Sequence, residues 1–296
     1  MQRVLITGAR GFAGRHLRAA LEERGIETIA AVADVRDADA ISREIAASRP
    51  DAIAHLAAVT SVADAWSRER EVWDANAIGT LNVVLAAERH APAARLLVAS
   101  SAEVYGTVAE DEGPVQEDRP VAPISPYGRS KVAAEAACAR EDIDVVVVRP
   151  FPHTGPGQSE KFAIPWFAGQ IARIEAGRAA PSLKVGNLAA RRDYSDVRCV
   201  ADAYARLLAQ RGGSRLFNVA TGTAHTMQSV LDRMLKLATV EIAVEVDPSR
   251  MRPGDVPLLV GSSQRLAEAT GWRPRRSLDE TLADVLEAAR EGVGTE

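Results

Sequence analysis

The chain has 296 residues, of which 47% are hydrophobic and 26% charged, and its formal net charge is −4. This length suits one large domain or two domains that share an interface, and the composition is that of an ordinary globular enzyme. The net negative charge argues against wholesale nucleic-acid binding, and no apolar run approaches the length of a membrane span. Two cysteines without a pairing pattern, and no visible leader ahead of the apolar run at 4–6, predict a cytoplasmic protein; we expect no metal site.

The first half of the chain alternates short apolar runs with amphipathic helical patterns. The runs at 4–7, 28–32, 52–56, 96–100 and 145–148 predict strands, and the stretches 14–24, 40–48, 72–89 and 127–140 predict helices. This βαβα order predicts an α/β fold with a doubly wound parallel Rossmann sheet. After about residue 157 the pattern becomes less regular, and one more strand-like run follows at 216–220. We therefore expect an NAD(P)-binding Rossmann domain over 1–158 and a smaller substrate-binding lobe over 159–296, of which roughly 191–222 packs back onto the sheet.

A glycine-rich turn follows the first predicted strand. Residues 4–14 read VLITGARGFAG, so that Gly8, Gly11 and Gly14 separate a strand from a helix. Glycines let the backbone approach a diphosphate closely, and the N-terminus of the following helix offers free N–H groups to that anion. The position of this motif, at the first turn of a βαβ unit, predicts a dinucleotide-binding loop.

Two residues bear on the choice between NAD and NADP. Asp34 stands 20 residues after Gly14, where a carboxylate would bind the ribose 2′-hydroxyl of NAD, although its place in DVRD also suits a position facing the adenine. Arg10 lies inside the glycine loop, where a guanidinium would pair with the 2′-phosphate of NADP. We expect NADP(H), with NAD(H) as the alternative.

The stretch PISPYGRSK contains Tyr127 and, one helical turn later, Lys131. Only 4 of the 36 basic residues are lysines, so the choice of Lys here calls for a reason. Reduction of a ketone needs a hydride on carbon and a proton on oxygen, and a nearby ammonium would lower the pKa of a phenol toward the working range. A compact ammonium also fits beneath a phenol better than a guanidinium fork does. Ser100 and Ser101, at the end of a predicted strand, would bring a hydroxyl to the same edge of the sheet.

Together, the GxxGxxG turn, the serine at a strand end and the YxxxK pair resemble the extended short-chain dehydrogenase/reductase superfamily over essentially the whole chain. The resemblance implies a seven-stranded Rossmann sheet and a small sugar-nucleotide lobe. It assigns Ser101 as the catalytic hydroxyl, Tyr127 as the acid/base and Lys131 as its partner. His55 is expected to be a packing residue. The residues that the resemblance places near the cofactor, besides the three glycines, Arg10 and Asp34, are Phe12, Val35, Leu56, Ala57, Ala58, Asn76, Tyr127 and Lys131.

The second half of the chain is similar to the GDP-mannose branch of this superfamily, through HTGPGQ, KVGNLAARRDYSDV and RMRPGDVPLLVGSSQRLAEATGWRP. Within that branch the reductases match better than the dehydratases. This implies NAD(P)H-dependent reduction of the 4-keto group of GDP-4-dehydro-6-deoxy-D-mannose to GDP-D-rhamnose. The likeness assigns Arg192 and Arg252 to the diphosphate, Lys184, Val185 and Asn187 to the guanine, and His153 to the substrate. It also implies a homodimer through helices near 72–89 and 127–140.

Three residues leave alternatives open. Glu103 lies two residues after Ser101, where 4,6-dehydratases carry a glutamate, so GDP-mannose 4,6-dehydratase or another nucleotide-sugar 4-reductase or epimerase is the alternative function. Pro152 stands where the branch usually has Asn, and it removes a backbone donor. Cys199 stands where the branch expects Asp, and we expect it to affect packing of the lobe more than the chemistry.

Overall fold

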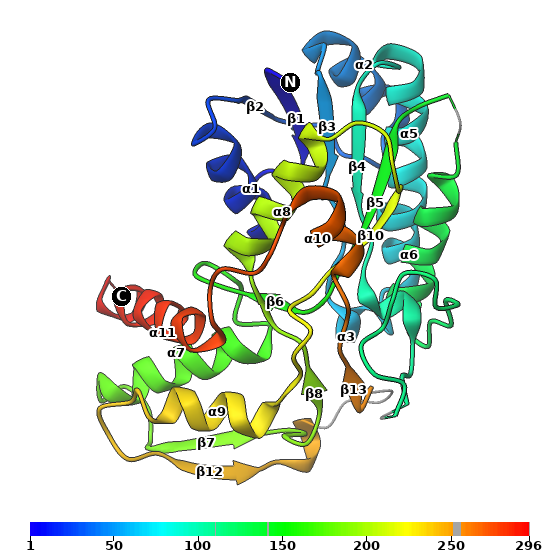
Figure 1. Ribbon diagram of the computed structural model, residues 1–296. Coiled ribbons are helices and arrows are strands. Elements are labelled where there is room, and N and C mark those ends of the chain that lie inside the picture. The colour runs from blue at the N-terminus through cyan, green and yellow to red at the C-terminus, as the bar shows by residue number, and fades with distance from the viewer. Residues whose placement is uncertain (110, 141, 251–255, 296) are drawn as a thin grey trace.

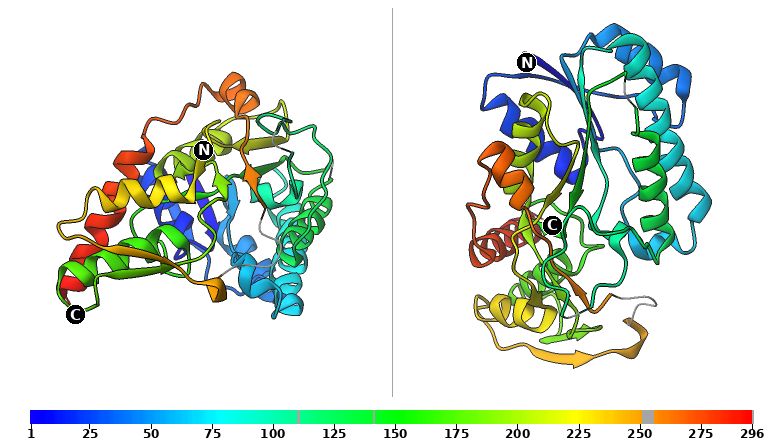
Figure 2. Two further views of the ribbon diagram at one scale, coloured as in Figure 1. Left: turned by 90° about the horizontal axis from the view of Figure 1, so that it is seen from below. Right: turned by 45° about the vertical axis from the view of Figure 1, so that its right-hand side comes forward.

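The computed structural model describes residues 1–109, 111–140, 142–250 and 256–295. Its centre is a parallel sheet in the order β10-β5-β4-β3-β1-β2, seen edge-on at the right of Figure 2. The strands are β1 (Arg3–Thr7), β2 (Glu27–Ala30), β3 (Ala52–His55), β4 (Arg95–Ala99), β5 (Val145–Pro150) and β10 (Leu216–Val219). Every pairing in it is parallel. The predicted fold class is therefore confirmed.

The central strands are buried on both faces, which explains why their sequences are continuous apolar runs. All four residues of β3 and the first five of β5 are buried. The expectation of seven strands is wrong, because the sheet has six in the part of the chain that the structure describes. After β2 the chain runs through a loop at 31–37 to the next helix, whose N-cap Asp37 accepts a hydrogen bond of 2.9 Å from the amide of Ala40. This loop contains no strand.

Helices cover both faces of the sheet (Figure 2). One face carries α1 (Phe12–Glu22), α8 (Val197–Ala209) and α10 (Gln264–Thr270), which share a core cluster with the sheet. The other face carries α2 (Ala38–Ser48), α5 (Gly79–His90) and α6 (Pro126–Ala137). The predicted helix at 72–89 is divided into α4 (Glu69–Trp73), a π-helical turn (Asp74–Ile78) and α5. Short helices α3 (Val62–Ala65) and a 3-10 turn (Ala102–Tyr105) lie at the carboxyl end of the sheet.

A smaller lobe lies below that end of the sheet in Figure 1. Its helices are α7 (Ala163–Glu175), α9 (Met227–Leu235) and α11 (Leu278–Thr295), with a 3-10 turn at Pro248–Arg250. Its strands form two small sheets, β7 (Ser182–Val185) with β12 (Ala243–Val246), and β8 (Arg191–Arg192) between β11 (His225–Thr226) and β13 (Leu258–Leu259). A fourth sheet pairs β6 (His153–Thr154) with β9 (Ser195–Asp196). The domain boundary at 158/159 stays a prediction.

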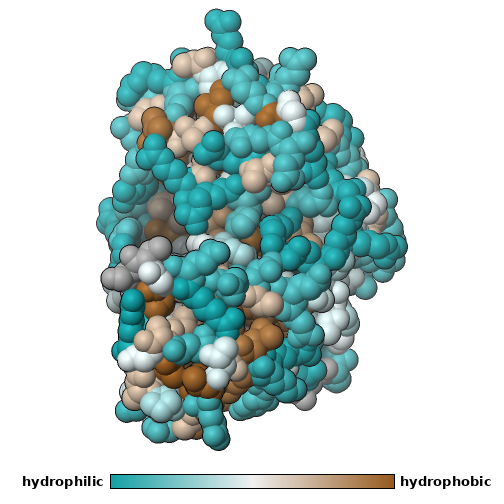
Figure 3. All heavy atoms as spheres, turned by 90° about the vertical axis from the view of Figure 1, so that its left-hand side faces the viewer, coloured by the Kyte–Doolittle hydropathy of each residue, from teal (hydrophilic) through white to brown (hydrophobic). Residues whose placement is uncertain are grey.

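The molecular surface is mainly hydrophilic on the face shown in Figure 3. Figure 3 shows a face covered mostly by hydrophilic side chains, with apolar ones gathered mainly toward the end that holds the small lobe. Within the described residues, no helix has both the length and the apolar character that a bilayer span requires.

Trp272 provides a test of the packing between the sheet and α8. Its side chain is fully buried, and the indole N–H donates a 3.0 Å hydrogen bond to the carbonyl oxygen of Cys199. We expect Trp272→Ala to lower the free energy of unfolding by about 3–5 kcal/mol. The matched control is Trp66→Ala, which removes an indole that is 51% exposed and should cost less than about 0.5 kcal/mol. Urea unfolding followed by circular dichroism measures both, and equal losses would contradict the packing described here.

Candidate functional site

The glycine turn joins β1 to α1 at the carboxyl edge of the sheet. Gly8 has a φ of +71°, and a Cβ there would stand 2.7 Å from the amide nitrogen of Ala57. A Cβ at Gly14 would collide with the carbonyl oxygen of Gly8. Gly11 is the N-cap of α1 and supplies no side chain to cap it, so the first amides of α1 face outward from the turn. This arrangement fits an anionic diphosphate, with Arg10 exposed in the same turn.

His55 lies behind this turn and joins three elements. Its Nδ1 is 2.7 Å from the hydroxyl of Thr7, at the end of β1, and its Nε2 is 3.0 Å from the hydroxyl of Thr80 in α5. Burial and, to a smaller extent, the charge of Lys131 lower the pKa of His55 to about 3. His55 is therefore a neutral packing residue. The Thr7 hydroxyl also accepts a 3.2 Å bond from the amide of Ala57, which places Leu56, Ala57 and Ala58 beside the glycine turn.

Asn76 lies in the π-helical turn and is completely buried. Its side-chain amide donates to the carbonyl of Val59 and to the hydroxyl of Ser130, both at 3.0 Å, and its oxygen accepts from the amide of Val59 at 2.8 Å. Asn76 thus ties the loop after β3 to helix α6. The polar atoms of the Asn76 side chain are bonded within the protein, so the residue positions the predicted cofactor loop.

Asp34 and Arg36 form a bidentate ion pair on the loop after β2. Both side chains are about half exposed. The hydrogen bonds from Arg36 lower the pKa of Asp34 to about 2. The carboxylate that would favour NAD is thus already engaged by a guanidinium. Val35 is buried, and its carbonyl accepts a 2.9 Å bond from Asn82 of α5.

The predicted catalytic trio of Ser101, Tyr127 and Lys131 comes together at the carboxyl end of β4. Ser101 caps the 3-10 turn by accepting a 3.2 Å bond from the amide of Glu103, and its hydroxyl is hydrogen-bonded to the Tyr127 phenol. The Lys131 ammonium lies 5.9 Å from the centre of the Tyr127 ring and donates a 2.8 Å bond to the carbonyl of Ala99. Gly128 permits the close approach of these two elements, because a Cβ there would stand 2.7 Å from the carbonyl oxygen of Glu103.

The electrostatics of the trio differ from the simple expectation in one respect. Burial raises the pKa of the Tyr127 phenol above its ordinary value; the bond with Ser101 lowers it and the carboxylate of Glu103 raises it. Burial lowers the pKa of the Lys131 ammonium to about 8, against the opposing effects of Cys138 and Glu135. The expectation that Lys131 brings the phenol's pKa down is wrong for this structure, where removal from water is the largest effect and raises that pKa. Tyr127 is therefore a protonated phenol at neutral pH.

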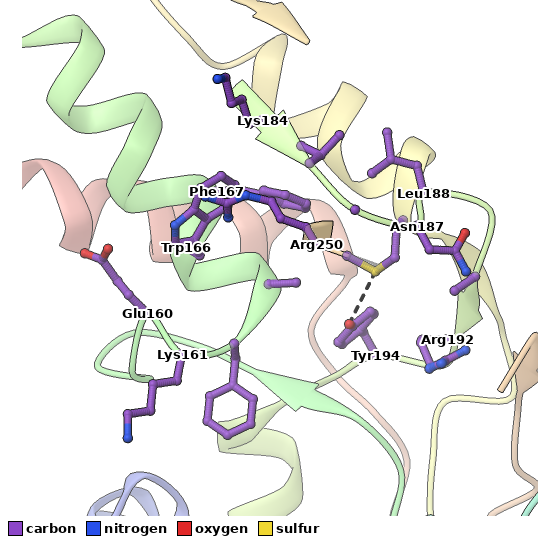
Figure 4. A pocket seen from close by; sticks show the side chains of 16 residues that line it. Glu160, Lys161, Trp166, Phe167, Lys184, Asn187, Leu188, Arg192, Tyr194 and Arg250 are labelled. Carbon is purple, nitrogen blue, oxygen red and sulfur yellow. Dashed lines mark hydrogen bonds between the residues drawn. The ribbon is translucent and has the colours of Figure 1, made fainter. Parts of the chain in front are cut away.

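A cavity of about 320 Å³ opens in the small lobe between α7, β7 and β8 (Figure 4). Four of the predicted substrate residues line it: Lys184, Val185, Asn187 and Arg192. Arg252, the fifth, lies outside the described residues. In Figure 4 Arg192 and Lys161 lie on opposite sides of the view, so the cavity carries basic groups at separated positions. Three of the four lysines of the chain, Lys131, Lys161 and Lys184, lie in the trio or along this cavity.

His153 is placed elsewhere. Its ring stacks on Phe12, with centroids 6.0 Å apart, and its Nδ1 is 3.1 Å from the carbonyl of Phe151. It does not line the cavity, and burial lowers its pKa. Phe12 in turn packs edge-on against His16. His153 therefore joins the glycine turn to the segment that enters the small lobe.

Sequence reasoning missed several residues that line the cavity, Trp166 and Arg250 among them. Trp166 of α7 and Arg250 stack on each other, with the guanidinium 4.5 Å from the indole centre. A Cβ at Gly186 would stand 2.6 Å from the carbonyl of Arg250, so the Gly in KVGN permits this approach. Trp166 lies within an amphipathic helical pattern that gave no sign of a site, whereas Arg250 is two residues from the predicted Arg252.

Comparison with known proteins gives a consistent result. The family described as GDP-mannose 4,6 dehydratase matches residues 29–285. A GDP-6-deoxy-D-mannose reductase of Pseudomonas aeruginosa is 35% identical, with 96% of each chain covered. The solved structure of RMD from Pseudomonas aeruginosa complexed with NADPH has a TM-score of 0.91 and 34% identity, covering 99% of this chain and 100% of that one. A Thermus thermophilus UDP-glucose 4-epimerase complexed with NAD has a TM-score of 0.86 and 29% identity, covering 98% and 99%.

The buried imidazole of His55 predicts a pH dependence of stability. Between pH 6.5 and about 3 an unfolded His55 binds a proton that the folded one does not, so stability is present above pH 6.5 and is lost as pH falls toward 3. This one group contributes at most about 1.4 kcal/mol per pH unit. Urea unfolding of wild type and His55→Gln from pH 7 to 4 should show a shallower loss in the variant. His90→Gln, which removes a surface imidazole, should keep the wild-type slope; equal slopes for wild type and His55→Gln would contradict the prediction.

Proposed function

The chain belongs to the GDP-mannose 4,6-dehydratase family, and on that basis we propose that it reduces the 4-keto group of GDP-4-dehydro-6-deoxy-D-mannose with NADPH, forming GDP-D-rhamnose. One observation carries the chemistry: a buried phenol, hydrogen-bonded to Ser101, stands over a buried ammonium at the edge of the sheet that holds the glycine turn. The identity of the relative narrows the substrate, since its name specifies a GDP-6-deoxymannose reductase.

The glycine turn fits the diphosphate of a dinucleotide. Side chains at Gly8 or Gly14 would fill the space against Ala57 and Ala9, and the amides at the start of α1 point away from the turn. Gly8, Gly11 and Gly14 would hold the diphosphate, with Phe12, Val35 and the 56–58 loop beside it. Bound NADPH supplies the hydride for C4 of the sugar.

Tyr127 is the proposed proton donor. Because its pKa lies above the ordinary value, the phenol carries its proton at neutral pH and is poised to protonate the oxygen that gains negative charge during reduction. The Ser101 hydroxyl, which is hydrogen-bonded to Tyr127, would hold the sugar oxygen. The Lys131 ammonium would stabilise the phenolate left after transfer, since it lies 5.9 Å from the ring centre in a site removed from water.

NADPH is the proposed cofactor in preference to NADH. Asp34 is held by Arg36, so the ribose end of the site presents a guanidinium beside the carboxylate and a second, exposed one at Arg10. A 2′-phosphate would gain from these cations, whereas a 2′-hydroxyl would have to compete for Asp34.

The cavity of the small lobe is the proposed GDP site. Arg192 would bind the diphosphate, as would Arg252, which lies outside the described residues, and Lys184, Val185 and Asn187 would border the guanine. Binding of GDP there, remote from the reacting atoms, would position the C4 carbonyl. His153 would act through Phe12 rather than on the sugar.

Dehydration of GDP-mannose is the alternative, and Glu103 is the residue that supports it. Its carboxylate lies close enough to Tyr127 to raise the phenol's pKa, so it faces the reacting centre. A 4,6-dehydratase would use such an acid to remove water from C5 and C6, whereas a reductase would not need it.

One assay separates these activities. Purified protein is mixed with NADPH and GDP-4-dehydro-6-deoxy-D-mannose, and absorbance of the reduced cofactor is followed. We expect stoichiometric oxidation of NADPH and a GDP-6-deoxyhexose product. No oxidation, together with loss of water from GDP-mannose, would instead show the dehydratase.

Tyr127→Phe tests the proton donor in the same assay. We expect kcat to fall by about 10²–10⁴ because general acid catalysis contributes that much, while the Kd for NADPH stays near wild type. Tyr204→Phe is the control, since Tyr204 is another buried phenol, within the sheet core. Turnover retained in Tyr127→Phe would remove Tyr127 from its role.

A cytoplasmic homodimer formed through α5 and α6 completes the proposal. Ile78 and Leu85 are seven residues apart and are 48% and 44% exposed, so they place apolar surface on one side of this helical segment. Helices α5 and α6 pack side by side on the outer face of the sheet.

Leu85→Glu tests this interface. A buried charge at a dimer interface is costly, so light scattering at micromolar concentration should show a dimer for wild type and a monomer for the variant. Leu237→Glu, at a leucine of the small lobe with 42% exposure, should remain dimeric. A wild-type monomer would contradict the proposed interface.

A further inference from the structure

A cluster of charged and polar side chains lies directly behind the catalytic trio. Glu135 of α6 accepts two hydrogen bonds from the guanidinium of Arg149 in β5, at 2.8 Å to Oε1 and 2.6 Å to Oε2. The hydroxyl of Ser100 donates a 2.5 Å bond to Oε1 of the same carboxylate. Glu135 therefore joins the residue after β4, the body of β5 and the helix that carries Tyr127 and Lys131.

The Arg149–Glu135 ion pair is largely buried, and its retention in the protein interior calls for an explanation. The side chains of Arg149 and Glu135 are 6% and 15% exposed. Two charges removed from water gain little net stability over an apolar pair of similar volume, although breaking such a pair is costly. Arg149 extends the cluster, since its guanidinium lies 4.8 Å from the centre of the Tyr105 ring and 3.4 Å from the carbonyl of Glu117. The cluster thus extends from Tyr105 and Glu117 through Arg149 to Glu135 of α6.

Lys131 stands one helical turn before Glu135. Its ammonium is buried and has a 2.8 Å hydrogen bond to the carbonyl of Ala99, the residue that precedes Ser100. The carboxylate of Glu135 favours the charged form of Lys131, whereas burial disfavours it. The titratable and charged groups that face Lys131 from its own helix and the neighbouring elements are Tyr127, Glu135, Cys138, His55 and, through Glu135, Arg149.

We propose that Glu135 is a positioning residue for proton transfer: by holding Ser100 and Arg149 against α6, it fixes Lys131 under Tyr127 and keeps the ammonium charged. This inference rests on the proposed reductase function, because it assumes that Tyr127 and Lys131 are the proton-transfer pair. Glu135 itself touches neither substrate nor cofactor in this scheme. It acts through the end of β4, whose Ala99 carbonyl binds Lys131 and whose next residues are Ser100 and Ser101.

Glu135→Gln tests the charge while retaining the shape. The amide still accepts the bond from Ser100, but Arg149 loses half of its bidentate contact, and the negative charge that favours the Lys131 ammonium is removed. Both changes disfavour the ammonium, so its titration midpoint should fall by about one pH unit. The chain has only four lysines, so lysine labelled with ¹³C at Cε gives a readily assigned spectrum, with Lys131→Arg identifying the relevant signal.

This spectroscopic readout is independent of turnover. The expected result is a Lys131 midpoint near pH 8 in wild type and about one unit lower in Glu135→Gln. An unchanged midpoint would overturn the proposal. A control is Glu175→Gln, because Glu175 also forms a bidentate pair, with Arg290 at 2.8 Å for both bonds, in the small lobe. It should lose comparable stability without moving the Lys131 midpoint.

Kinetics then separate a positioning role from a structural one. In Glu135→Gln we expect a lower kcat with an unchanged KM for the GDP-sugar, and a pH profile whose alkaline limb moves to lower pH. Glu175→Gln should keep the wild-type profile. If wild type itself oxidises no NADPH, the proposed function fails, while the Lys131 titration still decides the inference; if wild type turns over and Glu135→Gln has the same profile, the inference alone fails.

A second variant covers the case in which Glu135→Gln does not fold. Ser100→Ala removes the hydroxyl that joins β4 to Glu135 and leaves both charges in place. We expect a several-fold lower kcat, an unchanged KM and a Lys131 midpoint that stays near the wild-type value. A wild-type kcat in folded Ser100→Ala would overturn the positioning role.

Discussion

An ammonium held out of water is the constraint around which this site is built. Lys131 is 4% exposed, and burial lowers the pKa of its ammonium to about 8. Cys138 and the Glu135 carboxylate oppose that effect, and the Ala99 carbonyl accepts a hydrogen bond from the ammonium. The same removal from water raises the pKa of Tyr127. Removal from water thus favours the protonated tyrosine but disfavours the charged lysine, which keeps its charge through its partners.

The cofactor side is organised around backbone approach rather than charge. Gly8, Gly14 and Gly128 each occupy a position where a Cβ would meet a neighbouring main chain. His55 and Asn76 hold the surrounding loops from behind, through hydrogen bonds that leave the front of the site to the ligand. Arg10 and Arg36 supply positive charge at one end of the cofactor side, and Lys161 and Arg192 supply it along the cavity.

Sequence patterns were sufficient for those features that depend on local chain properties. The β-branched run at 145–148 became a strand buried on both faces, and the spacing of Tyr127 and Lys131 put them on one side of α6. The prediction of a seventh strand was wrong because it came from the family likeness, whereas residues 31–37 of this chain form a loop that leads into α2. Sequence distance says nothing of the stacking of His153 on Phe12, so its assignment to the substrate stays a prediction. Trp166 was missed because an indole on a core-like helix has no local signature. The pKa of Tyr127 depends on burial, which no spacing reveals.

Strand β10 has a consequence for the integrity of the fold. It pairs with β5 at the border of the sheet, yet it comes from residues 216–219, long after the chain has entered the small lobe. Helix α8, which follows β9, likewise covers the same layer as α1. The two halves are therefore interlaced, and a fragment ending before α7 would leave β5 as a bare, apolar edge open to self-association. The cofactor-binding half and the sugar-binding half must accordingly fold together, from one uninterrupted polypeptide.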